Sequence, residues 1–241
     1  MADDTDTDTP DAAPAGAARG PGWTLDAAET RVLGVLIEKQ RTVPDTYPLT
    51  LNSLVAGCNQ KTSRHPVLEL SDAQVQAALE GLRAHALVTE SSGGRAMRYG
   101  HNADRVLKLP SQSVILLAVL MLRGPQTAGE LRIASDRMHN FADISSVEAF
   151  LDELAERPAG ALVVRLPRLP GARESRWMHL LAGPPSDDLL VAAPSVAARA
   201  EPAGSGALQE RVTQLEGQVA TLRALLDRVC AELGIEPAPP A

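Results

Sequence analysis

The residues best suited to chemistry form one polar segment, Asn59-Gln-Lys-Thr-Ser-Arg-His65, which carries two fixed positive charges and no acid. Lysine, arginine, serine and threonine side chains bind phosphate oxygens, and asparagine and glutamine can hydrogen-bond the edges of bases. The segment therefore predicts nucleic-acid contacts by Asn59, Gln60, Lys61, Thr62, Arg64 and His65. The alternative is a structural loop, in which these side chains cap helix ends and satisfy backbone groups. The sequence leaves both interpretations open.

Helices must position this segment, because it lies between two amphipathic stretches. Apolar residues recur with helical spacing from Thr24, and a second helix is expected over 49–58. After the segment, Ser71 is followed three residues later by a glutamine, the pattern of a capping box that opens a third helix. Short strands at about 86–89 and 95–99, joined by a Ser-Ser-Gly-Gly turn, predict a β-hairpin.

The same order of elements recurs in the second half of the chain. Residues 113–122 form an apolar first helix, a Thr-x-x-Glu capping box opens a second at Thr127, and a hairpin with a long tip is expected over 161–181. The third helices share the pattern Val-x-Ala-x-Leu-x-x-Leu, which begins at Val75 and again at Val147. Three helices and a hairpin are the winged-helix arrangement. Two unrelated α+β domains with coincidental patterning are the alternative.

Arginines gather in both expected hairpins. The first hairpin has no acid between Ser91 and Asn102, and the second has Glu174 alone among four arginines. In DNA-binding winged helices, basic hairpins reach phosphates or a minor groove. The residues predicted to do so are Arg95, Arg98, Arg165, Arg168, Arg173 and Arg176. In the alternative, the arginine stems cover apolar strands and their charges stay in solvent.

The predicted fold is therefore α+β and mainly helical, with two tandem winged-helix domains and a C-terminal coiled-coil helix. Stretches rich in small, polar and proline residues mark the tail and the linker. The predicted organisation is a disordered acidic tail over 1–22, winged-helix domains over 23–103 and 104–181, a flexible linker over 182–206, a coiled-coil helix over 207–234 and a disordered tail over 235–241.

A heptad pattern near the C-terminus predicts self-association. Valine or leucine recurs at alternating spacings of four and three, which favours a parallel two-stranded coiled coil. The expected dimer seam is Leu208, Val212, Leu215, Val219, Leu222, Leu226, Val229 and Leu233. We therefore expect a homodimer. An amphipathic helix that folds back onto its own domains is the alternative.

Charge is unevenly distributed along the chain, whose formal net charge is −7. Residues 1–20 carry five aspartates and one arginine, and residues 182–241 carry eight acids and four arginines. Residues 21–181 are nearly neutral, with 17 acids and 18 bases. A protein that binds nucleic acid by bulk charge would be more basic.

The third helix of each repeat, which enters the major groove in DNA-binding winged helices, is expected to expose acids. The residues concerned are Asp72 and Glu80 in the first copy and Glu148, Asp152, Glu153 and Glu156 in the second. Carboxylates repel phosphates, so these helices favour a different use of the fold, as a protein–protein interaction adaptor.

No enzyme motif is present. A Gly-rich nucleotide loop, a nucleophile elbow and a zinc-protease motif are all missing, and the five histidines lack metal-ligand spacing. Cys58 is expected in the core, and with Cys230 it forms neither a disulfide framework nor a zinc site. We expect a non-catalytic protein with no cofactor and no metal. The longest apolar run has nine residues and no secretory signal is seen, so no membrane association and a cytoplasmic location are expected.

Longer motifs run through both repeats. They are Glu38-Lys-Gln40, Pro44, Tyr47-Pro-Leu-Thr-Leu-Asn-Ser53, Cys58-Asn-Gln-Lys-Thr-Ser-Arg64, Pro66-Val67, Leu122-Arg-Gly-Pro-Gln-Thr127, Gly129-Glu-Leu-Arg132 and Pro170-Gly-x-Arg173-Glu174-Ser-Arg-Trp-Met-His179-Leu180. Together they resemble the YceH family of uncharacterised bacterial proteins, over about residues 24–181 and on to the coiled coil. The resemblance implies a tandem winged-helix fold and, by analogy, a role near DNA. The acidic N-terminal tail is an addition relative to that family.

Two functions follow from these patterns. The first is a regulator-like nucleic-acid-binding protein, dimerised by its coiled coil, which contacts double-stranded DNA through the 59–65 segment and the hairpins. The second is an adaptor whose partner is a protein. The first requires the scattered cations to gather on one positive surface that the neighbouring carboxylates do not oppose.

Overall fold

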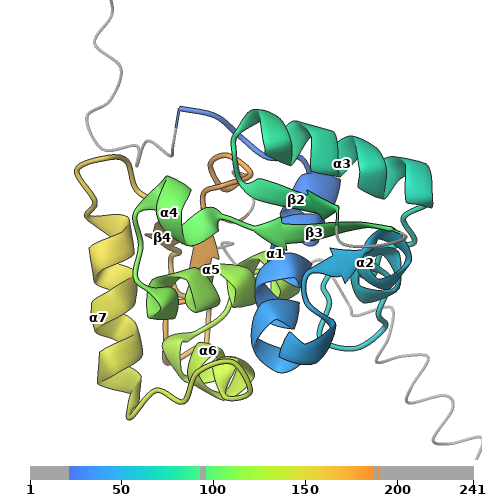
Figure 1. Cartoon of the computed structure of the whole chain (residues 1–241). Coiled ribbons are helices and arrows are strands. Elements are labelled where there is room, and N and C mark those ends of the chain that lie inside the picture. The colour runs from blue at the N-terminus through green and yellow to red at the C-terminus, as the bar shows by residue number, and fades with distance from the viewer. Residues whose placement is uncertain (1–21, 93–95, 187–188, 190–241) are drawn as a thin grey trace, which may run out of the picture. The chain divides into compact units, whose positions relative to one another are not determined.

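The computed structural model of the chain describes residues 22–92, 96–186 and 189, which belong to one compact unit. Arg95, the predicted coiled-coil helix with its seam, and the predicted tails apart from Gly22 lie outside the described residues. The described part is a mixed α+β structure in which helices predominate, as the sequence predicts (Figure 1).

Three helices open the first half, and their starts follow from local sequence. They are α1 (Ala27–Thr42), α2 (Leu51–Cys58) and α3 (Asp72–Ala84). α1 begins after Asp26, whose side chain accepts a backbone N–H of the first turn. α3 begins with the predicted capping box of Ser71 and Gln74. Such caps satisfy N–H groups that a helix leaves without partners.

An antiparallel sheet completes the first half. Its strands, in spatial order, are β1 (Leu49–Thr50), β3 (Met97–His101) and β2 (Val88–Ser92). β2 and β3 form the predicted hairpin, in which Glu90 lies opposite Tyr99. The sequence analysis misses β1, because two residues cannot show an alternating pattern, and it misses the 3₁₀ turn Pro44–Thr46 before it. Leu49 of β1 pairs with Tyr99, and both side chains are buried.

The second half follows the same order after a short helix that the sequence does not predict. Its elements are α4 (Ala103–Leu107), α5 (Ser111–Arg123), α6 (Ala128–Ser135), α7 (Ile144–Ala155), β4 (Val163–Arg165) and β5 (Trp177–His179). The predicted capping box of Thr127 and Glu130 opens α6. The strands are shorter than expected. The repeated pattern marks the same buried face on both third helices: Val75, Leu79 and Leu82 on α3, and Val147, Leu151 and Leu154 on α7.

The two halves pack on each other through α1 and α5, which lie together in Figure 1. α1 is buried from Thr30 to Ile37 and α5 from Ser113 to Leu122, as expected for helices that are apolar on most faces. The helices are in close contact at Gly34, where a Cβ atom would lie 3.0 Å from the Leu122 side chain. A residue without a side chain therefore permits this close approach.

Backbone hydrogen bonds also join the halves. The Leu25 N–H donates to the Leu181 carbonyl at 2.7 Å, and the His65 N–H donates to the Leu122 carbonyl at 2.7 Å. The start of the first half is thereby tied to the end of the second. The predicted boundary between residues 103 and 104 stays a prediction.

Candidate nucleic-acid interface

The polar segment 59–65 is divided between the interior and the surface. Arg64 is buried, and its guanidinium donates to the Glu38 carboxylate at 2.6 and 3.1 Å and to the Gly57 carbonyl at 3.1 and 3.3 Å. It also donates to Gln60 and to the Ser63 carbonyl, each at 2.9 Å. These bonds use all three guanidinium nitrogens. The predicted nucleic-acid contact by Arg64 is therefore corrected to an internal structural role.

Asn59 is corrected in the same way. Its amide donates to the Leu70 carbonyl and its side-chain oxygen accepts the Leu70 N–H, both at 2.8 Å. Arg31, which the sequence analysis misses, is also buried and donates to the Cys58 carbonyl at 2.9 Å. Arg31 and Arg64 thus bind carbonyl groups at the C-terminal end of α2, which the helix itself leaves without partners. For these residues, the structural-loop interpretation applies.

Glu38 stays ionised inside this network. Burial acts to raise the pKa of Glu38, but the hydrogen bonds and charge of Arg64, together with Lys39 at 3.2 Å, outweigh burial and lower that pKa. The Arg64–Glu38 pair therefore remains charged at neutral pH. It fixes the backbone on which the exposed residues Lys61 and Thr62 stand.

The outer part of the segment reaches the second half. Besides the backbone bond from His65 to Leu122, the Arg123 guanidinium donates to Ser63 Oγ at 2.9 Å. The segment therefore bridges from the end of α2 to the end of α5. This bridge places Lys61 near cations that lie far from it in the sequence.

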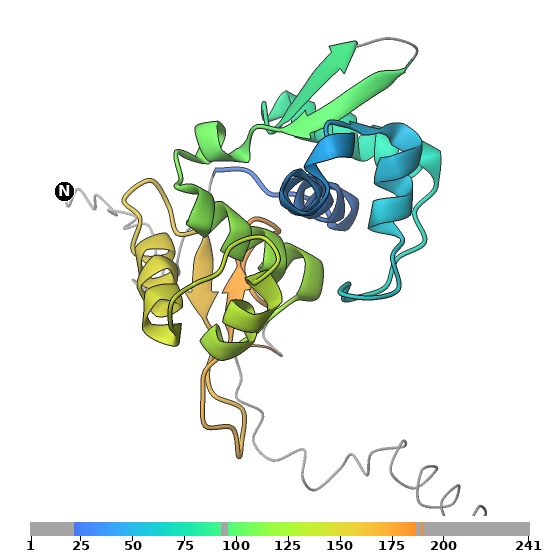
Figure 2. The same ribbon diagram turned by 60° about the horizontal axis from the view of Figure 1, so that its bottom comes forward.

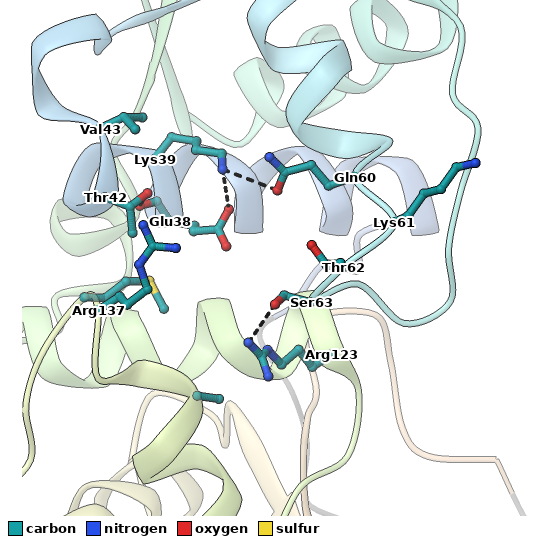
Figure 3. A pocket seen from close by; sticks show the side chains of 12 residues that line it. Glu38, Lys39, Thr42, Val43, Gln60, Lys61, Thr62, Ser63, Arg123 and Arg137 are labelled. Carbon is teal, nitrogen blue, oxygen red and sulfur yellow. Dashed lines mark hydrogen bonds and ion pairs between the residues drawn. The ribbon is translucent and has the colours of Figure 1, made fainter.

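A cleft of about 320 Å³ lies where α1, the 59–63 segment and the second half meet (Figure 3). We call it the basic cleft. Its polar lining is Glu38, Lys39 and Thr42 from α1, Gln60, Lys61, Thr62 and Ser63 from the segment, and Arg123 and Arg137 from the second half. The sequence analysis proposes the 59–65 segment, including Gln60, Lys61 and Thr62, and misses the lining residues from α1 and the second half, because only the packing of α1 on α5 brings them together.

Four bases and one acid line the basic cleft: Lys39, Lys61, Arg123 and Arg137, with Glu38. Arg64 and Lys39 compensate the charge of Glu38. Among the described residues, no ion pair joins Lys61, Arg123 or Arg137 to an acid. In Figure 3 Arg137 points towards Glu38, whereas Lys61 extends outward along the edge. Ammonium, guanidinium and hydroxyl groups in this arrangement suit phosphate oxygens or another anion.

The arginine of the first hairpin that the structure describes does not join the basic cleft. Arg98 is half-buried, and its guanidinium donates to the Pro48 carbonyl at 2.8 Å. It holds the hairpin against the turn before β1. His65, by contrast, is exposed beside the basic cleft but does not line it.

The second hairpin has a separate group of arginines. Arg165 stacks over the Trp177 ring at 5.7 Å, and Arg176 is half-buried. Arg168 and Arg173 are exposed and line a smaller pocket together with Arg165, where Glu148 and Glu174 reduce the positive charge. Figure 2 shows the β2–β3 hairpin and the β4–β5 connection pointing away from each other. The predicted cations that the structure describes therefore lie in separate places, and among them only Lys61 lines the basic cleft. They do not form the single positive surface that the sequence-based nucleic-acid hypothesis requires.

Both third helices expose the acids that the sequence analysis expects. On α3 Asp72 and Glu80 are exposed. On α7 the exposed acids are Glu148, Asp152 and Glu153, and Glu156 is exposed at the C-cap. Phosphates would meet a repulsive face on α7.

Cys58 is buried, and burial raises the pKa of its thiol to about 12 although the Arg31 and Arg64 charges act to lower it. A thiol in this state is a poor nucleophile. Within the described ranges, no cluster of three or more His, Cys, Asp or Glu side chains is placed to hold a metal ion. In the same residues, no helix has the length and hydropathy to cross a membrane.

Comparison with known proteins shows the family. Residues 25–172 match the family described as "Protein of unknown function, DUF480", and the chain belongs to this family. It is 57% identical to a UPF0502 protein of Acidovorax sp. (strain JS42) over 215 residues, which cover 88% of this chain and 95% of the relative. A UPF0502 protein of Dechloromonas aromatica (strain RCB) is 57% identical over 205 residues, covering 84% and 94%. Membership in an uncharacterised bacterial family is thus confirmed.

Proposed function

We propose that the protein is a non-catalytic, regulator-like nucleic-acid-binding module that contacts the phosphate backbone through the basic cleft. The observation that carries this proposal is the convergence of Lys39, Lys61, Arg123 and Arg137 from three parts of the chain on one cleft. Backbone phosphates are the ligands that such side chains bind most often in protein–nucleic acid complexes.

The order of elements supports a tandem winged-helix architecture. Each half has three helices followed by an antiparallel hairpin, with the short α4 preceding these helices in the second half, and in the first half a short strand before the second helix pairs with the hairpin. This is the arrangement of a helix-turn-helix variant with a wing. In this proposal the loop between the second and third helices supplies the cleft, and the third helices stay outside the major groove because of their acids.

Contact through phosphates has a consequence for specificity. Phosphate contacts fix a protein on nucleic acid but carry no sequence information directly. We therefore expect affinity that varies little with sequence and falls steeply with salt.

The test is a titration of a labelled double-stranded oligonucleotide at low salt, followed by fluorescence anisotropy. Lys61→Ala with Arg137→Ala removes two exposed cleft cations that make no ion pair among the described residues. We expect about 5- to 30-fold weaker binding, from about 1 kcal/mol for each phosphate contact. The matched control is Arg105→Ala with Lys108→Ala, which removes the same charges from exposed positions outside the basic cleft. Absence of binding by the unmodified chain, or equal loss in both variants, contradicts the proposal.

An adaptor role is the second candidate, and a groove of about 330 Å³ between α3 and the first hairpin favours it. Glu80, Glu90 and Arg83 give this groove a negative balance, and Met97 is 44% exposed at its side. A peptide with an apolar and a basic side chain would fit such a surface. Met97→Asp should abolish capture of a partner that the unmodified chain retains, and capture that is unchanged by this substitution counts against the groove.

A further inference from the structure

The basic cleft has a candidate ligand within the same chain. Residues 1–20, which we call the acidic segment, carry no lysine, and Arg19 is their one base. Their acids are Asp3, Asp4, Asp6, Asp8 and Asp11. The segment precedes α1, and the far end of α1 lines the basic cleft through Glu38, Lys39 and Thr42.

The length of the chain allows the acids to reach the basic cleft. α1 has 16 residues, which corresponds to a length of about 24 Å. Asp11 and Asp8 precede Gly22 by 11 and 14 residues, so an extended chain spans up to about 36 and 46 Å. A flexible chain of that length has an average end-to-end distance of about 20 Å. Residues 22–26 add at most about 16 Å between Gly22 and the start of α1, so Asp8 and the acids before it can reach the far end of α1.

We infer that the acidic segment occupies the basic cleft in the free protein and competes there with nucleic-acid phosphates. Alternate residues of an extended chain face the same side about 7 Å apart, so a segment bound in this way would present Asp4, Asp6 and Asp8 as a row of carboxylates. In the proposed contact, these carboxylates bind Lys39, Arg123 and Arg137 in place of successive nucleic-acid phosphates. The contact itself requires only opposite charges and a sufficiently long chain. Its effect on nucleic-acid binding rests on the proposed function.

The loss of nucleic-acid affinity can be estimated because the acidic segment and the basic cleft belong to the same chain. A tethered segment acts at an effective concentration on the order of 1 mM. If the free segment bound the cleft with a Kd of about 1 mM, it would weaken nucleic-acid binding about two-fold, and a Kd of about 0.1 mM would weaken it about ten-fold. Weak contacts between a few carboxylates and bases are therefore enough.

The contact is tested first, in the full chain and without nucleic acid. A nitroxide spin label is attached through Thr5→Cys in a Cys230→Ser background, and Cys58 stays unlabelled because it is buried. We expect paramagnetic broadening of the amide signals of Lys61, Ser63 and Arg137. The amides of α7 should be unaffected, because its exposed acids repel the segment. Broadening should disappear in 0.5 M salt (about 4 Å Debye length) and when the five aspartates are changed to asparagine. Equal broadening on α7, or none at the basic cleft, overturns the inference.

Competition is tested second, by oligonucleotide anisotropy. Changing the five aspartates to asparagine should tighten binding about two- to ten-fold. The control changes three acids of α7 and the acid at its C-cap, Glu148→Gln, Asp152→Asn, Glu153→Gln and Glu156→Gln, which removes almost the same negative charge. An equal gain in the control shows a general charge effect and overturns competition. If broadening is seen but no variant binds the oligonucleotide, the intramolecular contact stands and the proposed function fails.

Discussion

Arg64 and Glu38 form a bidentate ion pair inside the fold, with Nη2 and Oε2 2.6 Å apart and Nη1 and Oε1 3.1 Å apart. The pair joins the last turns of α1 to the segment that follows α2. It helps decide which residues of that segment face solvent, because the other hydrogen bonds of Arg64 hold the Gly57 and Ser63 carbonyls and the Gln60 side chain. The positive surface of the protein therefore depends on an arginine that is not part of that surface.

Arg64→Ala is expected to destabilise the protein by about 3–5 kcal/mol. The substitution leaves a largely buried carboxylate without its main partner and the Gly57 carbonyl without a donor. Arg64→Lys should cost less, because the charge remains while the paired geometry is lost. Urea unfolding followed by circular dichroism measures both changes. Arg105→Ala, at an exposed site, is the control and should stay within about 0.5 kcal/mol. A loss of less than about 1 kcal/mol for Arg64→Ala would contradict the network described here.

Gly34→Ala is expected to destabilise the packing of α1 on α5 by about 1–3 kcal/mol. The added Cβ would lie 3.0 Å from Leu122 Cγ and Cδ2 and 3.4 Å from Met121 Cβ, so Leu122 or the helices must move. In an isolated helix, glycine to alanine is favourable by up to about 1 kcal/mol. A decrease in the unfolding free energy of Gly34→Ala would therefore come from the packing of α1 on α5.

A double-mutant cycle isolates that contact. Leu122→Ala alone should cost about 2–5 kcal/mol, because it leaves a cavity in the buried core. In the double variant the methyl group introduced by Gly34→Ala partly fills the cavity, so the cost of the double variant should fall below the sum of the single costs. Strict additivity of the unfolding free energies would show that the two residues do not meet.

Acid is expected to destabilise the fold between about pH 6.5 and pH 4 through two histidines. Burial lowers the pKa of His101 to about 4; the charge of Asp104 acts to raise this pKa and the charge of Arg41 acts to lower it. Burial alone lowers the pKa of His179 to about 4. The unfolded chain thus binds more protons than the folded one in this range, so the unfolding free energy rises with pH through it. Each histidine contributes at most about 3.5 kcal/mol, from about 1.4 kcal/mol per pKa unit.

The neutral form of His101 also has a defined hydrogen-bond pattern. The Ala103 N–H donates to Nδ1 at 3.3 Å, so Nε2 carries the proton and donates to Gln40 Oε1 at 2.8 Å. Urea unfolding at pH 7 and pH 5 should show a smaller stability difference in His101→Gln than in the unmodified chain. An unchanged pH dependence would assign the acid sensitivity to other groups.

Much of the fold could be predicted from local sequence, because its signals are short-range. The capping boxes at Ser71 and Thr127 and the repeated apolar pattern from Val75 and Val147 each specify a helix and its buried face. α4 has only five residues, too few to show a helical period, so it could not be found in this way. The dimer seam lies outside the described residues and stays a prediction.

The candidate site was harder to predict, because it is built by contacts between distant residues. Polar composition alone does not distinguish Lys61, which is exposed, from Arg64, which is buried three residues later. A usable signal was present in α1, where Arg31 directly precedes the apolar run 32–37 and Glu38 follows that run as an acid that can pair with a buried base. Arg123 and Arg137 carried no signal, since their place at the basic cleft follows from the packing of the two halves.

Salt dependence gives a final prediction, which separates phosphate contact from base contact. For double-stranded DNA, the slope of log K against log salt concentration is about −0.9 for each phosphate contact. Lys61→Ala with Arg137→Ala should therefore make the slope less steep by about 2, by the same amount for oligonucleotides of unrelated sequence. Arg105→Ala with Lys108→Ala should leave the slope nearly unchanged, since these side chains do not line the basic cleft. A loss of affinity confined to one oligonucleotide sequence, with an unchanged slope, would show that the cleft residues contact bases instead of the backbone.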